Sequence, residues 1–182
     1  MEPTAAAITD RTSMRRNLPQ AIEVRPARPA DASTLGRFGA RLARLHHRMD
    51  PRRFFASPGM EEGYASWLAR EMRSRKAVVL VAVVRAPRED RIVGYAYGRL
   101  EGREWNTLRD PAGVAVDLYV LPAARGRGAG RGLLEALTAE LAARGAPRVV
   151  LHVAARNAGA LALFERLGFR RTVVELAREC AP

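Results

Sequence analysis

The stretch DLYVLPAARGRGAGRGLL, residues 117–134, contains the pattern that decides the fold of this 182-residue chain. A strand-like run over residues 114–121 ends at Pro122, and a turn rich in Gly and Arg follows. A helix-like run comes next, with leucines at helical spacing at positions 133, 134, 137 and 141. Such a corner leaves several backbone N–H groups unpaired at the helix start, where they attract anions. The stretch therefore predicts a pyrophosphate-binding corner.

Two common nucleotide-binding motifs do not fit this corner. The P-loop requires a Lys after its last Gly, and none of these glycines is followed by Lys. The dinucleotide fingerprint G-x-G-x-x-G fails because Arg131 stands three residues after Gly128, and Leu133 stands three residues after Gly130. The pattern that does fit is R-x-x-G-x-G, which begins at Arg125. An Arg-containing, Gly-rich surface turn without a ligand is the alternative interpretation.

With its strand, Pro, Arg and helix in this order, the corner resembles the acyl-CoA signature Q/R-x-x-G-x-G/A of the GCN5-related N-acetyltransferase (GNAT) family. Residues 157–169, NAGALALFERLGF, resemble a second motif of that family, N-x-x-A-x-x-L-[YF]-E-x-x-GF. Asn157 also fits a helix N-cap and Gly168 fits a C′ glycine, so an ordinary well-capped helix is the alternative. Two motifs in the family's order are more specific than one, and the resemblance extends over residues 76–169.

The resemblance implies an α/β fold, a mixed sheet of the GNAT-like acyl-CoA N-acyltransferase type with a splayed central pair of strands. Apolar periodicity predicts the element order β-αα-βββ-α-β-α-β. The strands are expected over residues 22–27, 77–84, 92–100, 114–121, 149–153 and 169–176, and the first two helices over 31–49 and 60–74. In the family, the strand around residues 118–120 separates from the strand around 151–153. The resemblance implies that the pantetheine arm of acetyl-CoA enters this gap.

By the same resemblance, the residues that bind the donor lie on the strand, on the corner and in the second motif. They are Leu118, Tyr119, Val120, Arg125, Gly126, Arg127, Gly128, Ala129, Gly130, Arg131, Asn157 and Phe164. A backbone N–H near Val120 is expected to polarise the thioester carbonyl, which stabilises the oxyanion that develops there. Acetyl-CoA is the implied co-substrate, and no metal is expected.

The acceptor amine must lose a proton before it attacks, because an alkylamine is almost wholly protonated near pH 7. Asp117 is the first candidate for the general base, since burying an acid among apolar strand residues is unfavourable. A carboxylate at a strand edge or paired with an Arg is the alternative. His152 interrupts an apolar strand and is the second candidate, although a lone strand His is more often structural. His46 and His47 are interpreted as surface residues near a helix C-terminus.

The second motif departs from the family at one position. Many members have a Tyr there that can protonate the leaving thiolate, and this chain has Phe164, which has no proton to give. Water, the ammonium formed on attack or Tyr119 could supply the proton instead. Assignment of the general acid is therefore open, while the acyl-CoA interpretation stands.

The net charge of +12 raises the question of nucleic-acid binding. Lys76 is the only lysine, and the arginines are spread along the chain without alternating with aromatic residues. Such a distribution does not form a stacking surface for single strands. We expect a solvated basic surface that also attracts anionic CoA, and no specific nucleic-acid partner.

Length and composition indicate one domain. No apolar run approaches the ~20 residues of a membrane span, and residues 1–20 lack the apolar core of a signal peptide. Cys180 is the only cysteine, which argues against a disulfide framework. We expect a flexible tail over residues 1–20, a single domain over 21–182, a cytoplasmic location and no membrane partner. The short stretch after Leu176 suggests a final strand that is missing or completed by a partner chain, hence a possible homodimer.

Three functions remain open from the sequence. The first, which we expect, is an N-acetyltransferase that moves an acetyl group from acetyl-CoA to a primary amine of a small molecule by direct attack in a ternary complex. The second is the same chemistry on a protein or peptide. The third is a catalytically weak acyl-CoA-binding module, which Phe164 in place of Tyr would suit.

Overall fold

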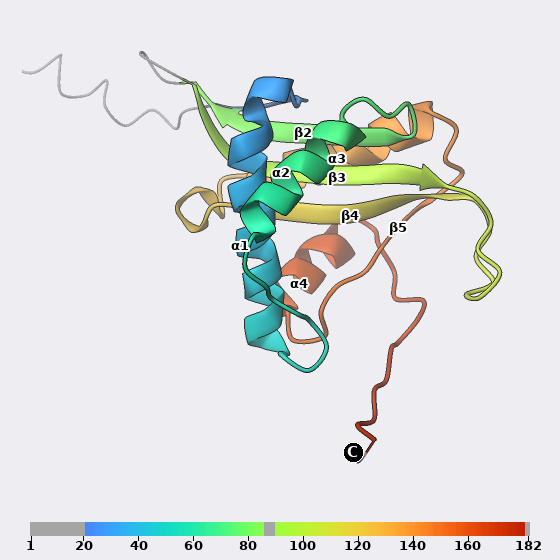
Figure 1. The fold of residues 1–182 in the computed structure, drawn as a ribbon. Coiled ribbons are helices and arrows are strands. Elements are labelled where there is room, and N and C mark those ends of the chain that lie inside the picture. Colours follow the sequence, from blue (N-terminus) through green and yellow to red (C-terminus); the bar gives the residue numbers. More distant parts are fainter. Residues whose placement is uncertain (1–20, 86–89, 181–182) are drawn as a thin grey trace, which may run out of the picture.

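The computed structural model describes residues 21–85 and 90–180. A five-stranded mixed sheet forms its centre, with helices on both faces (Figure 1). The tail expected over residues 1–20 lies outside the described residues, and so does the turn expected at 87–90, except for Asp90.

The observed elements follow the predicted order as far as the last helix. The strands are β1 (Ile22–Pro26), β2 (Ala77–Val84), β3 (Arg91–Glu101), β4 (Ala112–Val120) and β5 (Val149–Leu151). The helices are α1 (Ala32–Met49), α2 (Met60–Glu71), α3 (Ala129–Ala143) and α4 (Ala158–Arg166), with short 3-10 turns at Pro29–Asp31 and Pro122–Ala124. Strands β1 to β4 pair antiparallel in sequence order, and β5 pairs parallel to β4. The predicted α/β class with a mixed sheet is confirmed.

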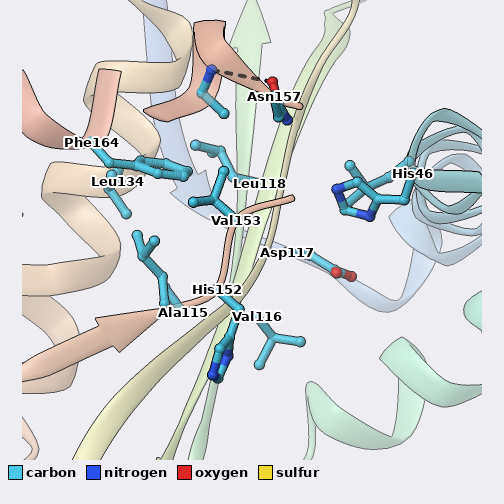
Figure 2. Close-up of a pocket in the computed structure, with 13 residues that line it drawn as sticks. His46, Ala115, Val116, Asp117, Leu118, Leu134, His152, Val153, Asn157 and Phe164 are labelled. Atoms are coloured by element: carbon cyan, nitrogen blue, oxygen red, sulfur yellow. Dashed lines mark hydrogen bonds between the residues drawn. The ribbon is translucent and has the colours of Figure 1, made fainter. Parts of the chain in front are cut away.

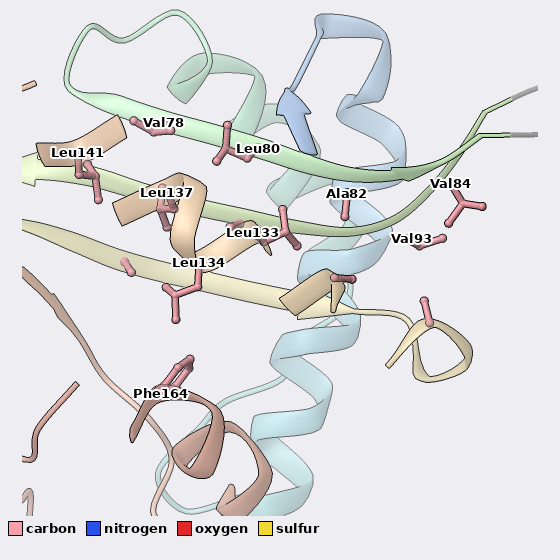
Figure 3. Close-up of a cluster of buried hydrophobic side chains, with 14 residues drawn as sticks. Val78, Leu80, Ala82, Val84, Val93, Leu133, Leu134, Leu137, Leu141 and Phe164 are labelled. Atoms are coloured by element: carbon pink, nitrogen blue, oxygen red, sulfur yellow. The ribbon is translucent and has the colours of Figure 1, made fainter. Parts of the chain in front are cut away.

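Two apolar cores lie on the two faces of the sheet. Helix α3 buries Leu133, Leu134, Leu137 and Leu141 against one face, together with Phe164 of α4 (Figure 3). Helices α1 and α2 cover the other face, where Leu35, Phe38 and Leu68 meet Tyr95 and Tyr119. All eight residues of β2 are buried, because this apolar strand has helices on both sides. Helices therefore pack on both faces of the sheet, which includes β4.

The strand predicted over residues 169–176 does not form, and that prediction is wrong. The chain leaves α4 and runs away from the body without secondary structure (Figure 1). Val173, Val174 and Leu176 are 85%, 77% and 90% exposed. Strand-forming residues make a strand only where a neighbouring edge and a buried face are available. The edge strand β5 has three residues, and among the described residues no strand pairs with residues 169–176.

None of the helices in residues 21–85 and 90–180 combines the length and the apolar character that a membrane span needs.

Candidate active site

Strands β4 and β5 separate after three paired residues. The pairs are Gly113 with Val149, Val114 with Val150, and Ala115 with Leu151. β4 then continues to Val120 while β5 ends, so a gap opens between β4 and the chain that follows β5. The splay that the family resemblance implied is therefore present.

A β-bulge in β4 lies where the splay begins. Tyr97 and Gly98 of β3 are consecutive, yet they face Asp117 and Ala115, which leaves Val116 as an extra residue. A bulge bends its strand and increases the local twist. Val116 is 44% exposed within a strand that is otherwise largely buried. The bend at Val116 accounts for the parting of β4 from β5.

The backbone groups of β4 that do not pair with β3 point into this gap. The N–H of Leu121 donates to the carbonyl of Val93 in β3 at 2.8 Å. Successive residues of a strand direct these groups to opposite sides, so the N–H and carbonyl groups of Leu118 and Val120 point away from β3. They are aligned to bind an extended chain laid along β4.

A pocket occupies the splay and brings together residues from α1, β4, α3, α4 and the end of β5. Its lining residues are Leu42, His46, Ala115, Val116, Asp117, Leu118, Leu134, Leu151, His152, Val153, Asn157, Ala160 and Phe164. Figure 2 shows His46 and Asp117 on one side of β4, and Leu134 and Phe164 on the other. The pocket therefore has a polar side toward α1 and an apolar side toward α3 and α4.

Asp117 is buried, with 8% of its surface exposed. The hydroxyl of Tyr95 donates a hydrogen bond of 2.8 Å to its carboxylate. Burial raises the pKa of Asp117 to about 6, although the Tyr95 hydrogen bond opposes the rise. The pKa of Tyr64 rises to about 12 because of burial and, second, because of the nearby Asp117 charge. An acid with a pKa of about 6 is mostly ionised at neutral pH and still basic enough to accept a proton.

His46 is the pocket residue that sequence reasoning assigned to the surface. Its imidazole is half-buried and stacks on Phe54, with ring centroids 5.1 Å apart. Burial lowers the pKa of His46, so the ring is neutral near pH 7. The signal was present in the helix periodicity, since His46 lies four residues after the buried Leu42 and therefore shares its face.

The other histidines lie differently. His152 lines the pocket but is exposed, and Figure 2 shows its ring pointing away from the Asp117 carboxylate. His47 has its Nδ1 within 2.6 Å of the Phe54 carbonyl. His47 of α1 therefore contacts the loop that follows the helix, and His152 lies at the pocket rim.

The Gly- and Arg-rich corner has the conformation expected of an anion site. Gly126 and Gly128 have φ of 73° and 86°, and a Cβ on either would meet open space. Helix α3 starts directly after Gly128. Among the described residues, no hydrogen-bond acceptor is found for the backbone N–H groups of residues 126–131. These donors surround a space that a phosphate can approach closely.

The three arginines of the corner are all exposed. Arg125 donates from Nε to the Val120 carbonyl at 3.1 Å, which joins the corner to the splayed strand. Arg131 pairs with Glu135 one turn along α3 at 2.9 Å. Arg127 and Arg131 add positive charge at the helix N-terminus, where it reinforces the helix dipole for an anion.

The remaining predicted donor residues are distributed over the corner and both faces of the sheet. Asn157 caps α4 by accepting from the N–H of Ala160 at 3.2 Å, which confirms the N-cap prediction. Phe164 is 8% exposed and lies in the pocket wall. Tyr119 faces the opposite core and packs on Phe38, with centroids 5.2 Å apart. Ala129 is buried and Gly130 packs against Leu163. The side chain of Tyr119 therefore lies on the other face of the sheet from α3, and only the backbone of this residue is near the splay.

A family model described as the acetyltransferase (GNAT) family matches residues 43–169, more than half of the chain. The chain belongs to the GNAT family. One curated relative, the mycothiol acetyltransferase of Thermomonospora curvata, is 31% identical over 138 residues, which cover 74% of this chain and 43% of that protein. This GNAT chain thus spans less than half the length of that relative.

Solved structures agree on the GNAT fold. A mutant of the BH1408 protein from Bacillus halodurans superposes with a TM-score of 0.69 at 23% identity, covering 86% of this chain and 99% of that one. A predicted acetyltransferase with acetyl-CoA from Clostridium acetobutylicum superposes with a TM-score of 0.65 at 16% identity, covering 87% and 96%. Within residues 21–85 and 90–180, no group of three or more His, Cys, Asp or Glu is arranged to hold a metal ion.

Proposed function

We propose that this protein is an N-acetyltransferase that transfers the acetyl group of acetyl-CoA to a primary amine of a small molecule. One observation carries the proposal: the open backbone edge of β4 leads directly into the anion-binding corner at the start of α3. A pantetheine arm that ends in a pyrophosphate needs an open strand edge followed by an anion-binding site, which is the same order. We also propose that residues 21–182 form a single domain, because both cores are built on one sheet.

The donor would bind through backbone groups more than through side chains. In this proposal, the N–H groups of residues 126–131 hold the pyrophosphate, and Leu118 and Val120 hydrogen-bond to the pantetheine arm. Phe164 and Asn157 line the α4 side of the same pocket. Arg125 would exchange its bond to the Val120 carbonyl for one to a phosphate oxygen. The thioester then lies in the splay, with its carbonyl toward a β4 N–H.

Asp117 is our proposed general base. It accepts a proton from the acceptor ammonium, directly or through a water molecule, which leaves a neutral amine. The amine nitrogen then bonds to the thioester carbon, the C–S bond breaks, and the thiolate leaves with its electron pair. Water or the ammonium formed on attack returns a proton to the thiolate, since Phe164 cannot. Holding both reactants in attack geometry supplies much of the acceleration.

The acceptor would enter from the α1 side, where the polar wall of the pocket lies. His46, Asp117 and the rim residue His152 all suit a cationic or hydroxylated small molecule. The similarity to a mycothiol acetyltransferase supports a small acceptor. Transfer to a protein or peptide is the second candidate, which the open rim of the pocket allows. A weak acyl-CoA-binding module is the third, and it is favoured only by Phe164.

Incubation with acetyl-CoA and a panel of amines, with release of free thiol as the signal, tests the proposal. Thiol release with small amines supports it, and release with peptides alone favours the second candidate. Saturable binding of CoA without turnover on any acceptor would leave the binding module. Absence of CoA binding would reject all three functions together with the assignment of the corner.

A further inference from the structure

Tyr64 of α2 packs closely on α1, and Gly39 makes this contact possible. A Cβ on Gly39 would lie 2.3 Å from Cδ1 and 2.5 Å from Cγ of the Tyr64 ring. A real Cβ atom does not come this close to another heavy atom, so a larger residue at position 39 would displace the ring. The missing Cβ therefore fixes the place of the Tyr64 ring against α1.

This contact places Tyr64 beside the pocket. Leu42 and His46 line the pocket from α1, and Gly39 lies three and seven residues before them, hence on the same face of the helix. On its other side, the Tyr64 ring meets Trp67 edge-on, with centroids 5.7 Å apart. Tyr64 therefore continues the α1 wall of the pocket, about one turn before Leu42.

The hydroxyl of Tyr64 is free in the part of the chain that the structure describes. The hydroxyls of Tyr95 and Tyr97, on the neighbouring strand β3, each donate to a carboxylate. Within residues 21–85 and 90–180, the Tyr64 hydroxyl makes no such bond, and it is not among the buried side-chain atoms that lack a partner. It is therefore open to a molecule that enters from solvent.

Asp117 and His46 lie on the same side of β4 as this hydroxyl. Figure 2 shows the His46 ring and the Asp117 carboxylate on the side of β4 toward α1. Burial and, second, the charge of Asp117 raise the pKa of Tyr64 to about 12. The phenol is therefore uncharged at neutral pH, and its oxygen can still accept a hydrogen bond. Three hydrogen-bond acceptors thus border the α1 side of the pocket: a carboxylate, a phenol oxygen and a neutral imidazole.

These three groups match a primary ammonium. An ammonium group of this kind has three N–H donors, and each of the three groups can accept one of them. A secondary ammonium has two N–H donors, and an alcohol has one O–H. After the primary ammonium loses a proton to Asp117, Tyr64 and His46 can still accept from the two N–H groups that remain.

We propose that Tyr64 determines acceptor specificity, because its hydroxyl accepts a hydrogen bond from a primary ammonium held between Asp117 and His46. The inference rests on the proposed function, which places the acceptor amine beside Asp117. Tyr64 does not protonate the leaving thiolate, since a phenol with a pKa of about 12 is a much weaker acid than a thiol with a pKa of about 8.5. It holds the acceptor while Asp117 takes the proton.

Discrimination between two acceptors tests this role. The probes are the most active small primary amine of the panel and its N-methyl derivative. The wild-type protein is expected to prefer the primary amine about tenfold in kcat/KM, and Tyr64→Phe is expected to lose most of this preference through a higher KM. A purely structural role would lower kcat/KM for both amines by the same factor. Tyr97→Phe is the matched control, since that hydroxyl bonds to Glu71, and it should keep the wild-type preference.

The glycine contact offers a second test that leaves the hydroxyl in place. Gly39→Ala pushes the Tyr64 ring from its position and is expected to reduce the preference in the same way. Gly63→Ala is its control, because a Cβ on this neighbour of Tyr64 would meet open space, and it should leave the preference unchanged. Circular dichroism of each variant verifies that the fold is intact.

Binding without turnover separates this inference from the proposed function. Titration of the protein with butylammonium chloride, followed by NMR, measures the ammonium site alone, and Tyr64→Phe is expected to weaken binding about tenfold. Absence of thiol release with every amine would reject the proposed function, and the titration would still decide the role of Tyr64. Equal affinity of wild type and Tyr64→Phe overturns the inference, and so does an unchanged preference between the two amines.

Discussion

The hydroxyl of Tyr95 on β3 donates to the carboxylate of Asp117 on β4 at 2.8 Å, and neither side chain is more than 8% exposed. The two residues are 22 positions apart, and the antiparallel register of β3 with β4 brings them together. Because hydrogen bonding favours the charged carboxylate while burial disfavours it, Tyr95 limits how far the pKa of Asp117 rises. The pair therefore sets the pH range in which Asp117 is ionised.

Replacing Tyr95 with Phe removes this hydrogen bond and leaves the ring in place. The pKa of Asp117 is expected to rise above about 6, so the acidic limb of the pH profile of kcat/KM moves to higher pH. Activity at high pH should change little, because Asp117 is ionised there in both proteins. An acidic limb that stays at the wild-type pH would show that Asp117 is not the group being titrated.

Asp117→Asn is expected to make the protein more stable and less active. The folded-state pKa of about 6 exceeds the ordinary value of 3.8, so the folded state binds more protons between these two values. Stability from this group is therefore lost as pH rises from about 4 to about 6. Asn carries no charge and can still accept from Tyr95, so it avoids a loss of about 1–3 kcal/mol near neutral pH.

Urea unfolding at two pH values measures this effect. The stability difference between Asp117→Asn and wild type should be present at about pH 7.5 and should shrink toward zero below about pH 4. The rate of acetyl transfer at neutral pH should fall about a hundredfold or more. An Asn variant that is less stable than wild type at neutral pH would contradict the account of the buried charge.

His46→Gln tests the α1 side of the pocket. Loss of the neutral imidazole is expected to lower kcat/KM for the acceptor amine about tenfold, while the affinity for acetyl-CoA stays the same. His47→Gln is the matched control, since His47 is the next residue of α1 and contacts the Phe54 carbonyl. Equal losses in both variants would point to a disturbed helix end, and unchanged kinetics in His46→Gln would remove His46 from the acceptor site.

Gly128→Asp tests the corner, and Gly145→Asp provides its control. Both glycines have positive φ, 86° and 96°, with open space where a Cβ would lie, so both substitutions carry a similar backbone cost. They lie beyond opposite ends of α3, a 15-residue helix that is about 22 Å long. Isothermal titration should show weaker acetyl-CoA binding, about tenfold or more, for Gly128→Asp alone. If the two variants bind acetyl-CoA with equal affinity, the phosphates of acetyl-CoA do not bind at this corner.

Local patterns explain what could be predicted from the sequence. The corner at residues 122–130 and the Asn157 cap depend on neighbours within a few positions, so their residue types alone indicate them. The helices followed from their apolar spacing for the same reason. A strand depends on distant partners, which is why residues 169–176 were predicted as a strand that the structure lacks.

The candidate site was predicted in part. Asp117 stood out as an acid among apolar residues, and it is buried in the pocket wall. Its partner Tyr95 could not be identified, because the pairing depends on a register that no sequence motif marks. His46 was assigned to the surface because its short-range signal, a basic residue near a helix end, agreed with an exposed position. Tertiary packing against Phe54 decides its place instead.

Deletion of the extra residue Val116 would affect the two cores and the pocket differently. Ala115 belongs to the α3 core and Asp117 contacts Tyr95 in the opposite core, so the two residues already lie on opposite faces. If Val116 were deleted, Ala115 and Asp117 would become neighbours, and neighbours in a regular strand also face opposite ways. Both cores would keep their side chains, while the bend that parts β4 from β5 would disappear. We therefore expect deletion of Val116 to leave a folded protein that lacks the gap between β4 and β5, where we propose that acetyl-CoA binds.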